Sequence, residues 1–313
     1  MGTLPAMADD VSSPDTSLTW IFGSSRSGST WLSRMLGELA GVTVVDDPHL
    51  GHHLGVWRPI PLAWATASEV PPLRTLPEIK AEREGYFFNE RYRDAWQPAL
   101  RTLIAERFAA QAAEDEPGPD GRRHVVVKEP GSQAAGLLLD LFPDSNLLFL
   151  VRDGRDVIDS WLDAYSEGSW AIEEGAYPVA ERGRVPLVEW LATVWVTRMR
   201  IVRECFERHD RGRRLLLRYE EMRRDPARVL REIRDTTGLA DPDALLEEVA
   251  ERHAFERTAR GERGRGKEIR QARPGGWRRG LDEEEARAAS RIMDPTLAEL
   301  GYETAAAREP VSA

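Results

Sequence analysis

The spacing of apolar residues along the chain predicts strands that alternate with helices. A run of bulky apolar residues from Leu18 to Phe22 ends at Gly23, and apolar positions then recur at helical spacing from Trp31 to Leu39. This pattern indicates a strand, a tight loop and a helix. The loop consists of glycine, serine and one arginine, so its backbone N–H groups are uncovered and face the N-terminus of the helix, where the helix dipole favours an anion. We therefore expect this loop to bind a phosphate group.

Four further apolar runs predict the other strands of a sheet, at 42–45, 124–128, 147–151 and 215–217. Helices are predicted between and after these strands, at 93–113, 133–142, 152–165, 186–209, 226–237, 242–252 and 282–300. Strands alternating with helices in this way are typical of a parallel sheet wrapped on both faces. We expect a P-loop-like α/β fold, with an open parallel sheet flanked by helices on both faces.

The length and the distribution of proline favour one domain with an insertion. A chain of 313 residues can form one large α/β domain or two small ones, and we expect a single domain over 18–303 between tails at 1–17 and 304–313. Residues 46–90 are the least regular part, because they hold six prolines among histidines and tryptophans. An insertion of this kind is typical of a lid or pocket wall, so we expect it to bind a substrate.

Charge and composition exclude several classes of protein. The formal net charge of −10 argues against a general nucleic-acid binder and against a polybasic membrane-surface protein. Ten basic and three acidic residues nevertheless lie between Arg252 and Arg279, as expected of an anion-binding segment. No stretch approaches the roughly 20 apolar residues of a spanning helix, and residues 1–17 lack the pattern of a signal peptide. The one cysteine, Cys205, fits a reducing compartment, so we expect a cytoplasmic protein.

The glycine-rich loop departs from nucleotide-binding P-loops at one position. Gly23 and Gly28 have the G-x-x-x-x-G spacing and Thr30 supplies the hydroxyl, but Ser29 stands where an ATP or GTP loop has lysine. A cation occurs at Arg26 instead, which suits a ligand whose transferring group lies beside the loop. A P-loop kinase and a glycine-rich turn without a ligand are the alternative interpretations.

Four motifs together resemble those of the sulfotransferases that use 3′-phosphoadenosine-5′-phosphosulfate (PAPS). In chain order they are GSSRSGSTWL from Gly23, LVRDGRDVIDSWL from Leu150, LLLRYEEMRRDP from Leu215 and RPGGWR from Arg273. The resemblance implies transfer of a sulfuryl group from PAPS to a hydroxyl or amine of a small-molecule or glycosylated acceptor, without a metal, leaving adenosine 3′,5′-bisphosphate (PAP). A non-catalytic PAP-binding protein is a further alternative. The acceptor itself and the oligomeric state are not readable from the sequence.

The same resemblance implies which residues bind PAPS. Those for the 5′-phosphosulfate lie in the loop and start the first helix: Ser24, Ser25, Arg26, Ser27, Gly28, Ser29, Thr30 and Trp31. Arg26 occupies the position that the family usually gives to lysine. Arg152 and Ser160 would bind the 3′-phosphate, and the alternative for Arg152 and Arg155 is ion pairing with Asp153 and Asp156. Tyr219 would lie at the adenine or serve as a structural tyrosine.

The carboxyl-terminal motif matches the family pattern R-K-G-x-x-G-D-W only in part. Arg270, Gly275 and Trp277 match, whereas Gln271, Ala272 and Gly276 depart from the pattern. By the resemblance Arg270 would bind the 3′-phosphate, and Arg265 or Arg273 could take this role.

The catalytic base is the open part of the prediction. Cytosolic small-molecule members of the family carry a histidine two residues after the lysine of the third strand, and here that position is Pro130. Lys128 is kept and would stabilise the bridging oxygen. Three of the six histidines fall within 49–53, and histidine is the best general base at neutral pH. His49 is therefore favoured as the base, with Glu129 and Asp47 as alternatives and a packing role as the competing interpretation.

Overall fold

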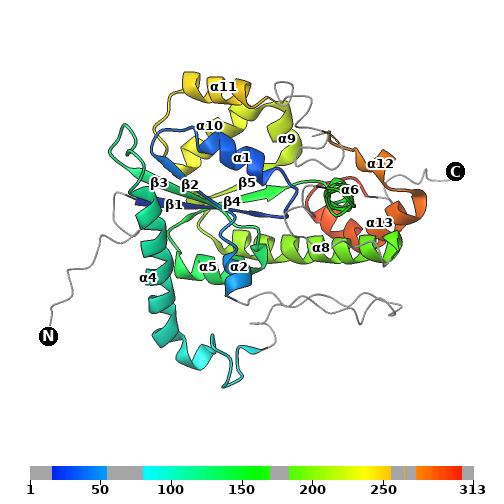
Figure 1. The fold of residues 1–313 in the computed structure, drawn as a ribbon, viewed down its shortest axis with the longest axis horizontal. Coiled ribbons are helices and arrows are strands. Elements are labelled where there is room, and N and C mark those ends of the chain that lie inside the picture. The colour runs from blue at the N-terminus through cyan, green and yellow to red at the C-terminus, as the bar shows by residue number, and fades with distance from the viewer. Residues whose placement is uncertain (1–15, 55–79, 170–182, 255–263, 265–272, 305–313) are drawn as a thin grey trace.

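Five parallel strands form one open sheet at the centre of the protein (Figure 1). The computed structural model describes residues 16–54, 80–169, 183–254, 264 and 273–304. The strand order is β2-β3-β1-β4-β5, and every neighbouring pair is parallel. The strands are β1 (Thr16–Gly23), β2 (Val42–Asp46), β3 (Arg123–Lys128), β4 (Asn146–Val151) and β5 (Arg214–Arg218). Because all five run the same way, their carboxyl ends meet at one edge of the sheet.

Helices cover both faces of this sheet, which confirms the predicted fold class (Figure 1). One layer contains α1 (Ser29–Leu36), α9 (Tyr219–Arg224), α10 (Pro226–Thr237) and α11 (Asp243–Arg252). The opposite layer contains α4 (Arg93–Ala112), α5 (Ala135–Leu141) and α8 (Arg184–Arg208). Four further helices are α2 (Leu50–His53), α6 (Gly154–Ala164), α12 (Trp277–Gly280) and α13 (Glu283–Glu299). Of these, α6 follows β4, and α13 packs against α8 and α6.

The two hydrophobic cores result from the alternation of side chains along the strands. Successive residues of a strand point to opposite faces of the sheet. On β1, Trp20 and Phe22 pack into the core with Phe108 of α4, whereas Ile21 packs into the other core with Leu32 of α1. The continuous apolar runs in the sequence therefore reflect strands buried on both faces.

Helix starts agree with local capping chemistry. The side chain of Asp153 accepts a hydrogen bond from the backbone N–H of Arg155, so α6 begins at Gly154 and not at 152 as expected. Asp225 caps α10 in the same way, with Pro226 in its first turn. The predicted 133–142 helix begins with a 3₁₀ turn (Ser132–Ala134) before α5.

Several predicted segments lie outside the described ranges, and several observed helices were not predicted. Residues 1–15 and 305–313 of the predicted tails and most of the 46–90 insertion fall outside those ranges, as do Arg265 and Arg270. Thr16 and Ser17, predicted to belong to the first tail, instead start β1. Short helices α2, α9 and α12 were not predicted. Within the described ranges, no helix combines the length and the hydrophobicity that crossing a membrane requires.

Candidate functional site

The loop between β1 and α1 is a tight turn whose glycine cannot be replaced without strain. Gly28 precedes α1 with φ at 95°, a conformation that side chains with a Cβ disfavour. A Cβ at this position would also lie 2.6 Å from a ring carbon of Tyr219. Both the backbone N–H and the hydroxyl of Ser27 donate to the carbonyl of Ser24, which closes the turn. The start of α1 therefore faces the carboxyl edge of the sheet with its N–H groups available for an anion.

Lys128 brings a positive charge to the start of α1. It ends β3, its residue is only 5 % exposed, and its ammonium donates to the Thr30 hydroxyl at 3.0 Å. The same nitrogen lies 2.7 Å from an Asp46 oxygen and 2.9 Å from an Asp47 oxygen. Two carboxylates at the end of β2 thus balance the charge and hold the ammonium beside the loop.

Arg26 connects the loop to the second predicted phosphate site. Its Nε donates to the hydroxyl of Ser160 at 3.1 Å, and its carbonyl accepts from Nη1 of Arg152 at 2.9 Å. The guanidinium of Arg152 also stacks over the ring of Tyr219 at 4.3 Å from its centre. Hydrogen bonds and stacking therefore join residues from the ends of β1 and β4 and from α6.

The loop borders a cavity of about 310 Å³ at the carboxyl edge of the sheet, whereas Arg152, Ser160 and Tyr219 are not among its lining residues. Its lining combines the loop with the ends of β2, β3 and β4: Ile21, Phe22, Gly23, Ser24, Ser25, Arg26, Ser27, Ser29, Thr30, Arg34, Asp46, Asp47, Lys128, Glu129, Pro130 and Leu150. Crevices at the carboxyl ends of parallel strands are the usual ligand sites of open α/β sheets. The predicted catalytic residues Asp47, Lys128 and Glu129 are among the lining residues.

Backbone strain is concentrated beside this cavity. Among the described residues, the non-glycine positions with positive φ are Arg26 at 69°, Asp47 at 49° and His49 at 53°. Such conformations cost free energy and persist only where the surrounding structure enforces them. All three positions are candidate catalytic residues from the sequence.

The three candidate bases occupy different environments. Glu129 is 2 % exposed, and its carboxylate accepts from the backbone N–H groups of Leu50 at 2.9 Å and Gly131 at 2.6 Å. Burial raises the pKa of Glu129, and the backbone N–H groups oppose that rise. Its lone pairs therefore hold the start of α2 in place. Asp47 lines the cavity, whereas the exposed side chain of His49 is not among the lining residues.

Two aromatic side chains, Tyr219 and Trp31, pack at the loop. Tyr219 is 4 % exposed, and burial raises the pKa of its hydroxyl. Its ring lies between the Gly28 backbone and the Arg152 guanidinium. Trp31 packs edge-on against Tyr219, and its indole N–H donates to the carbonyl of His253 at 2.9 Å. This arrangement gives Tyr219 a structural role; its predicted contact with adenine stays a prediction.

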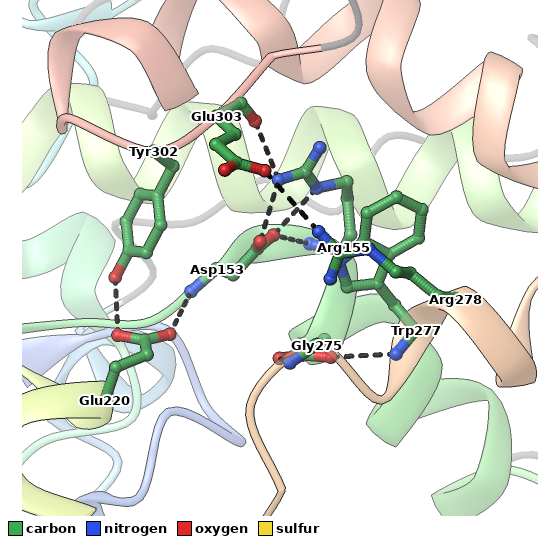
Figure 2. Close-up of polar contacts among 9 residues, drawn as sticks. Asp153, Arg155, Glu220, Gly275, Trp277, Arg278, Tyr302 and Glu303 are labelled. Carbon is green, nitrogen blue, oxygen red and sulfur yellow. Dashed lines mark hydrogen bonds and ion pairs between the residues drawn. The ribbon is translucent and has the colours of Figure 1, made fainter. Parts of the chain in front are cut away.

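A polar network fixes the start of α6, as Figure 2 shows. Arg155 forms a two-pronged contact with Asp153, at 2.9 and 2.8 Å, and its guanidinium stacks over Trp277 at 4.4 Å. The same guanidinium donates to the carbonyl of Glu303 at 2.8 Å. The ion pair that was the alternative for Arg155 is therefore observed. The Arg152 guanidinium contacts Arg26 and Tyr219 instead.

Two buried carboxylates complete the network around α6. Asp156 accepts from the backbone N–H groups of Gly275 at 2.7 Å and Trp277 at 2.9 Å, which anchors the RPGGWR motif against α6. Glu220 accepts from the N–H of Asp153 at 3.0 Å and from the hydroxyl of Tyr302 at 2.9 Å (Figure 2). Burial raises the pKa of both carboxyl groups. The helix that carries Ser160 is thus fastened to α9 and to the end of the chain.

Sequence reasoning missed two residues that contact the loop. Trp161 of α6 and Arg198 of α8 both donate to the hydroxyl of Ser25. Arg198 occupies a polar position of an amphipathic helix, where arginine is ordinary, so no local signal marks it. The sequence does mark Trp161, since it directly follows Ser160 in the second motif, LVRDGRDVIDSWL.

Comparison with known proteins identifies the family. The profile of the sulfotransferase family matches residues 19–243. The chain belongs to this family. Mouse sulfotransferase SULT7A1 complexed with PAP resembles this sulfotransferase with a TM-score of 0.53 at 12 % identity, over 90 % of this chain and 85 % of the mouse chain. Sulfotransferase STF9 from Mycobacterium avium gives 0.54 at 14 % identity, over 94 % and 79 %. These structures share its fold, and no curated relative matches it in sequence.

Proposed function

We propose that this sulfotransferase moves a sulfuryl group from PAPS to a hydroxyl or amine of a small-molecule or glycosylated acceptor, leaving PAP. The observation that carries the proposal is the position of Arg26, which contacts Ser160 and Arg152 while belonging to the phosphate loop. A donor with a phosphosulfate at one end and a 3′-phosphate at the other needs anion sites that are joined in this way. The PAP complex of the mouse relative supports the same choice of donor.

Polar groups at the site fit such a donor. The hydroxyl of Ser24 and the Nε of Arg152 are buried and have no hydrogen-bond partner among the described residues. Buried polar groups in proteins normally have partners, so these atoms point to a ligand. The N–H groups at the start of α1 would hold the 5′-phosphate, and Arg152 with Ser160 would hold the 3′-phosphate. PAPS supplies an activated sulfuryl group on a phosphate leaving group.

The cations at the loop would stabilise the charge that develops on transfer. Lys128 lies within hydrogen-bond distance of Thr30 at the start of α1, and Arg26 lies in the loop itself. Both are held before any ligand binds, Lys128 by Asp46 and Asp47 and Arg26 by Ser160. Preorganised charges of this kind stabilise a leaving oxygen without reorganisation during the reaction.

The geometry favours Asp47 as the general base over the two other candidates. Asp47 lines the cavity and its carboxylate is 2.9 Å from the Lys128 ammonium, which holds it toward the loop. Glu129 uses its oxygens on the backbone at α2, and His49 is exposed outside the lining. A base at Asp47 would take the acceptor proton at the mouth of the phosphate loop.

The acceptor and the location of the protein remain proposals from the sequence. We propose that residues 46–90 contact a small-molecule acceptor, since their tryptophans suit an aromatic, lipidic or glycosylated compound. A cytoplasmic location is proposed from the single cysteine, Cys205, which fits a reducing compartment.

Nucleotide choice tests the proposal directly. PAP at a hundred times its Kd should raise the free energy of unfolding by about 2.7 kcal/mol, whereas ATP with magnesium at the same concentration should raise it much less, because Ser29 replaces the P-loop lysine. Thermal denaturation measures both effects. Equal stabilisation by the two nucleotides would contradict PAPS as the donor and favour a kinase. Incubation with PAPS and an acceptor panel, read by the mass gain of one sulfuryl group, separates an enzyme from a PAP-binding protein.

A further inference from the structure

Two donors from α6 and α8 converge on the hydroxyl of Ser25 in the loop. Trp161 of α6 donates from its indole Nε1 to Ser25 Oγ at 3.1 Å. Arg198 of α8 donates from Nη1 to the same oxygen at 3.0 Å. The guanidinium of Arg198 also lies over the Trp161 ring, 5.7 Å from its centre. Three side chains from different parts of the chain therefore form one cluster.

The chemistry of these donors fixes the role of the hydroxyl. An indole N–H and a guanidinium can only donate, so the oxygen of Ser25 must accept from both. A hydroxyl oxygen has two lone pairs, and both are now used. The single O–H of Ser25 is left to donate in a direction away from Trp161 and Arg198.

The cavity is where that proton can be donated. Ser25 lines the cavity, whereas Trp161 and Arg198 are not among its lining residues. Within the described part of the chain, no group accepts the Ser25 proton. Burial also lowers the pKa of the Arg198 guanidinium, and the charges of Tyr165 and Glu129 oppose that shift.

We propose that Trp161 and Arg198 are positioning residues that make the Ser25 hydroxyl an obligatory hydrogen-bond donor to the 5′-phosphosulfate end of the bound nucleotide. This inference rests on the proposed function, because it assigns a contact within the same site. The loop would then offer a fixed side-chain donor in addition to its backbone N–H groups. Neither positioning residue needs to touch the ligand.

A double-mutant cycle tests this coupling. Ser25→Ala should raise the Kd for PAP, measured by isothermal titration calorimetry, by about tenfold or more, as expected for a lost hydrogen bond to a charged group. Trp161→Phe keeps an aromatic ring but removes the indole N–H donor, so the Ser25 hydroxyl can turn away from the ligand. The Kd for PAP should then rise by about threefold to tenfold. In the Ser25→Ala background, Trp161→Phe should have almost no further effect, because no hydroxyl remains to be oriented.

Two controls separate positioning from packing. Trp195→Phe removes another buried indole N–H, one that has no hydrogen-bond partner among the described residues. It should lower the melting temperature without changing the Kd for PAP. Arg198→Met provides a second cycle with Ser25→Ala if the Trp161 variant does not fold. Equal fold-changes for Trp161→Phe with and without the Ser25 hydroxyl would overturn the proposal.

The outcomes also distinguish this proposal from the proposed function. A folded parent protein that does not bind PAP would refute the proposed function, and the Ser25 assignment would fall with it. A parent protein that binds PAP as tightly as its Ser25→Ala variant would refute only the Ser25 assignment. With PAPS as substrate, the Ser25→Ala variant should show a raised KM, as expected for a contact that is already made in the bound state.

Discussion

Replacing Arg152 by alanine should weaken the binding of PAP far more than it weakens the fold. In the protein without ligand, the Arg152 side chain donates a 2.9 Å hydrogen bond to the Arg26 carbonyl and stacks over the Tyr219 ring at 4.3 Å from its centre. Its Nε is buried without a described partner. We expect that nitrogen to meet the 3′-phosphate, so truncation would leave a bound phosphate without its charged donor.

The magnitude can be worked out for each state separately. Truncating one partner of a desolvated charge pair costs about 2 to 4 kcal/mol of binding free energy, which corresponds to a rise in the Kd for PAP of about 30-fold to 900-fold. In the protein without ligand, loss of the stacking on Tyr219 and of the bond to Arg26 should lower the free energy of unfolding by about 1 to 3 kcal/mol. The variant should therefore remain folded.

Calorimetry with PAP and urea denaturation measure the two effects on the same samples. Arg152→Lys keeps the charge but loses the planar fork, so its Kd should lie between those of the parent and the alanine variant. Arg200→Ala is the matched control, because Arg200 pairs with Glu204 on α8, and this variant should bind PAP as the parent does. If Arg152→Ala also binds PAP with the parent's Kd, Arg152 only braces the loop through Arg26, and the assigned 3′-phosphate site is wrong.

Two further predictions concern the candidate bases. Asp47→Asn should lower kcat by about 10² to 10⁴ with little change in the Kd for PAP, while His49→Ala should keep near-parent turnover; the reverse result would assign the base to His49. At about pH 4, Glu129→Gln should lower the free energy of unfolding by about 1 to 3 kcal/mol, because glutamine offers one acceptor fewer to Leu50 and Gly131. Burial raises the pKa of Glu129 in the folded protein. The contribution of Glu129 to the free energy of unfolding is therefore complete below its pKa in the unfolded chain, about 4.3, and is lost as the pH rises through its pKa in the folded protein. The parent-minus-variant difference in urea denaturation should shrink with rising pH, and growth of that difference would contradict the assignment.

The sequence predicts best those residues of the candidate site that lie at the end of a strand or directly after it. The apolar run before Gly23 and the helical spacing after Trp31 predict the strand and the helix on either side of the glycine-rich loop, and both elements are observed. Lys128 ends β3 and Arg152 directly follows β4, as the apolar runs predict. Parallel pairing then brings these strand ends to one edge, so their proximity follows from topology alone.

Roles that depend on contacts between distant segments were not predictable in the same way. Glu129 is a plausible base by its place beside Lys128, yet its carboxylate holds the backbone of Leu50, 79 residues earlier in the chain. The helix α9 begins at Tyr219 immediately after β5, and no loop residue separates the two elements in the sequence. Local propensity does not reveal this direct passage from strand to helix, and it does not reveal that the Tyr219 ring packs closely against Gly28, about 190 residues earlier in the chain.

The polar network around α6 explains how the site can be rigid before a ligand binds. A nucleotide with several negative charges is bound well only by donors that are already in place, because ordering them during binding would cost free energy. Ser160 lies on α6, and the start of that helix is fastened by Asp153 to Glu220 and by Arg155 to Glu303. Asp156 fastens the same helix to the Trp277 segment. The buried charges of α6 thus hold Ser160 beside Arg26, and under the proposed function the orientation that they give to the 3′-phosphate site would offset their cost in desolvation.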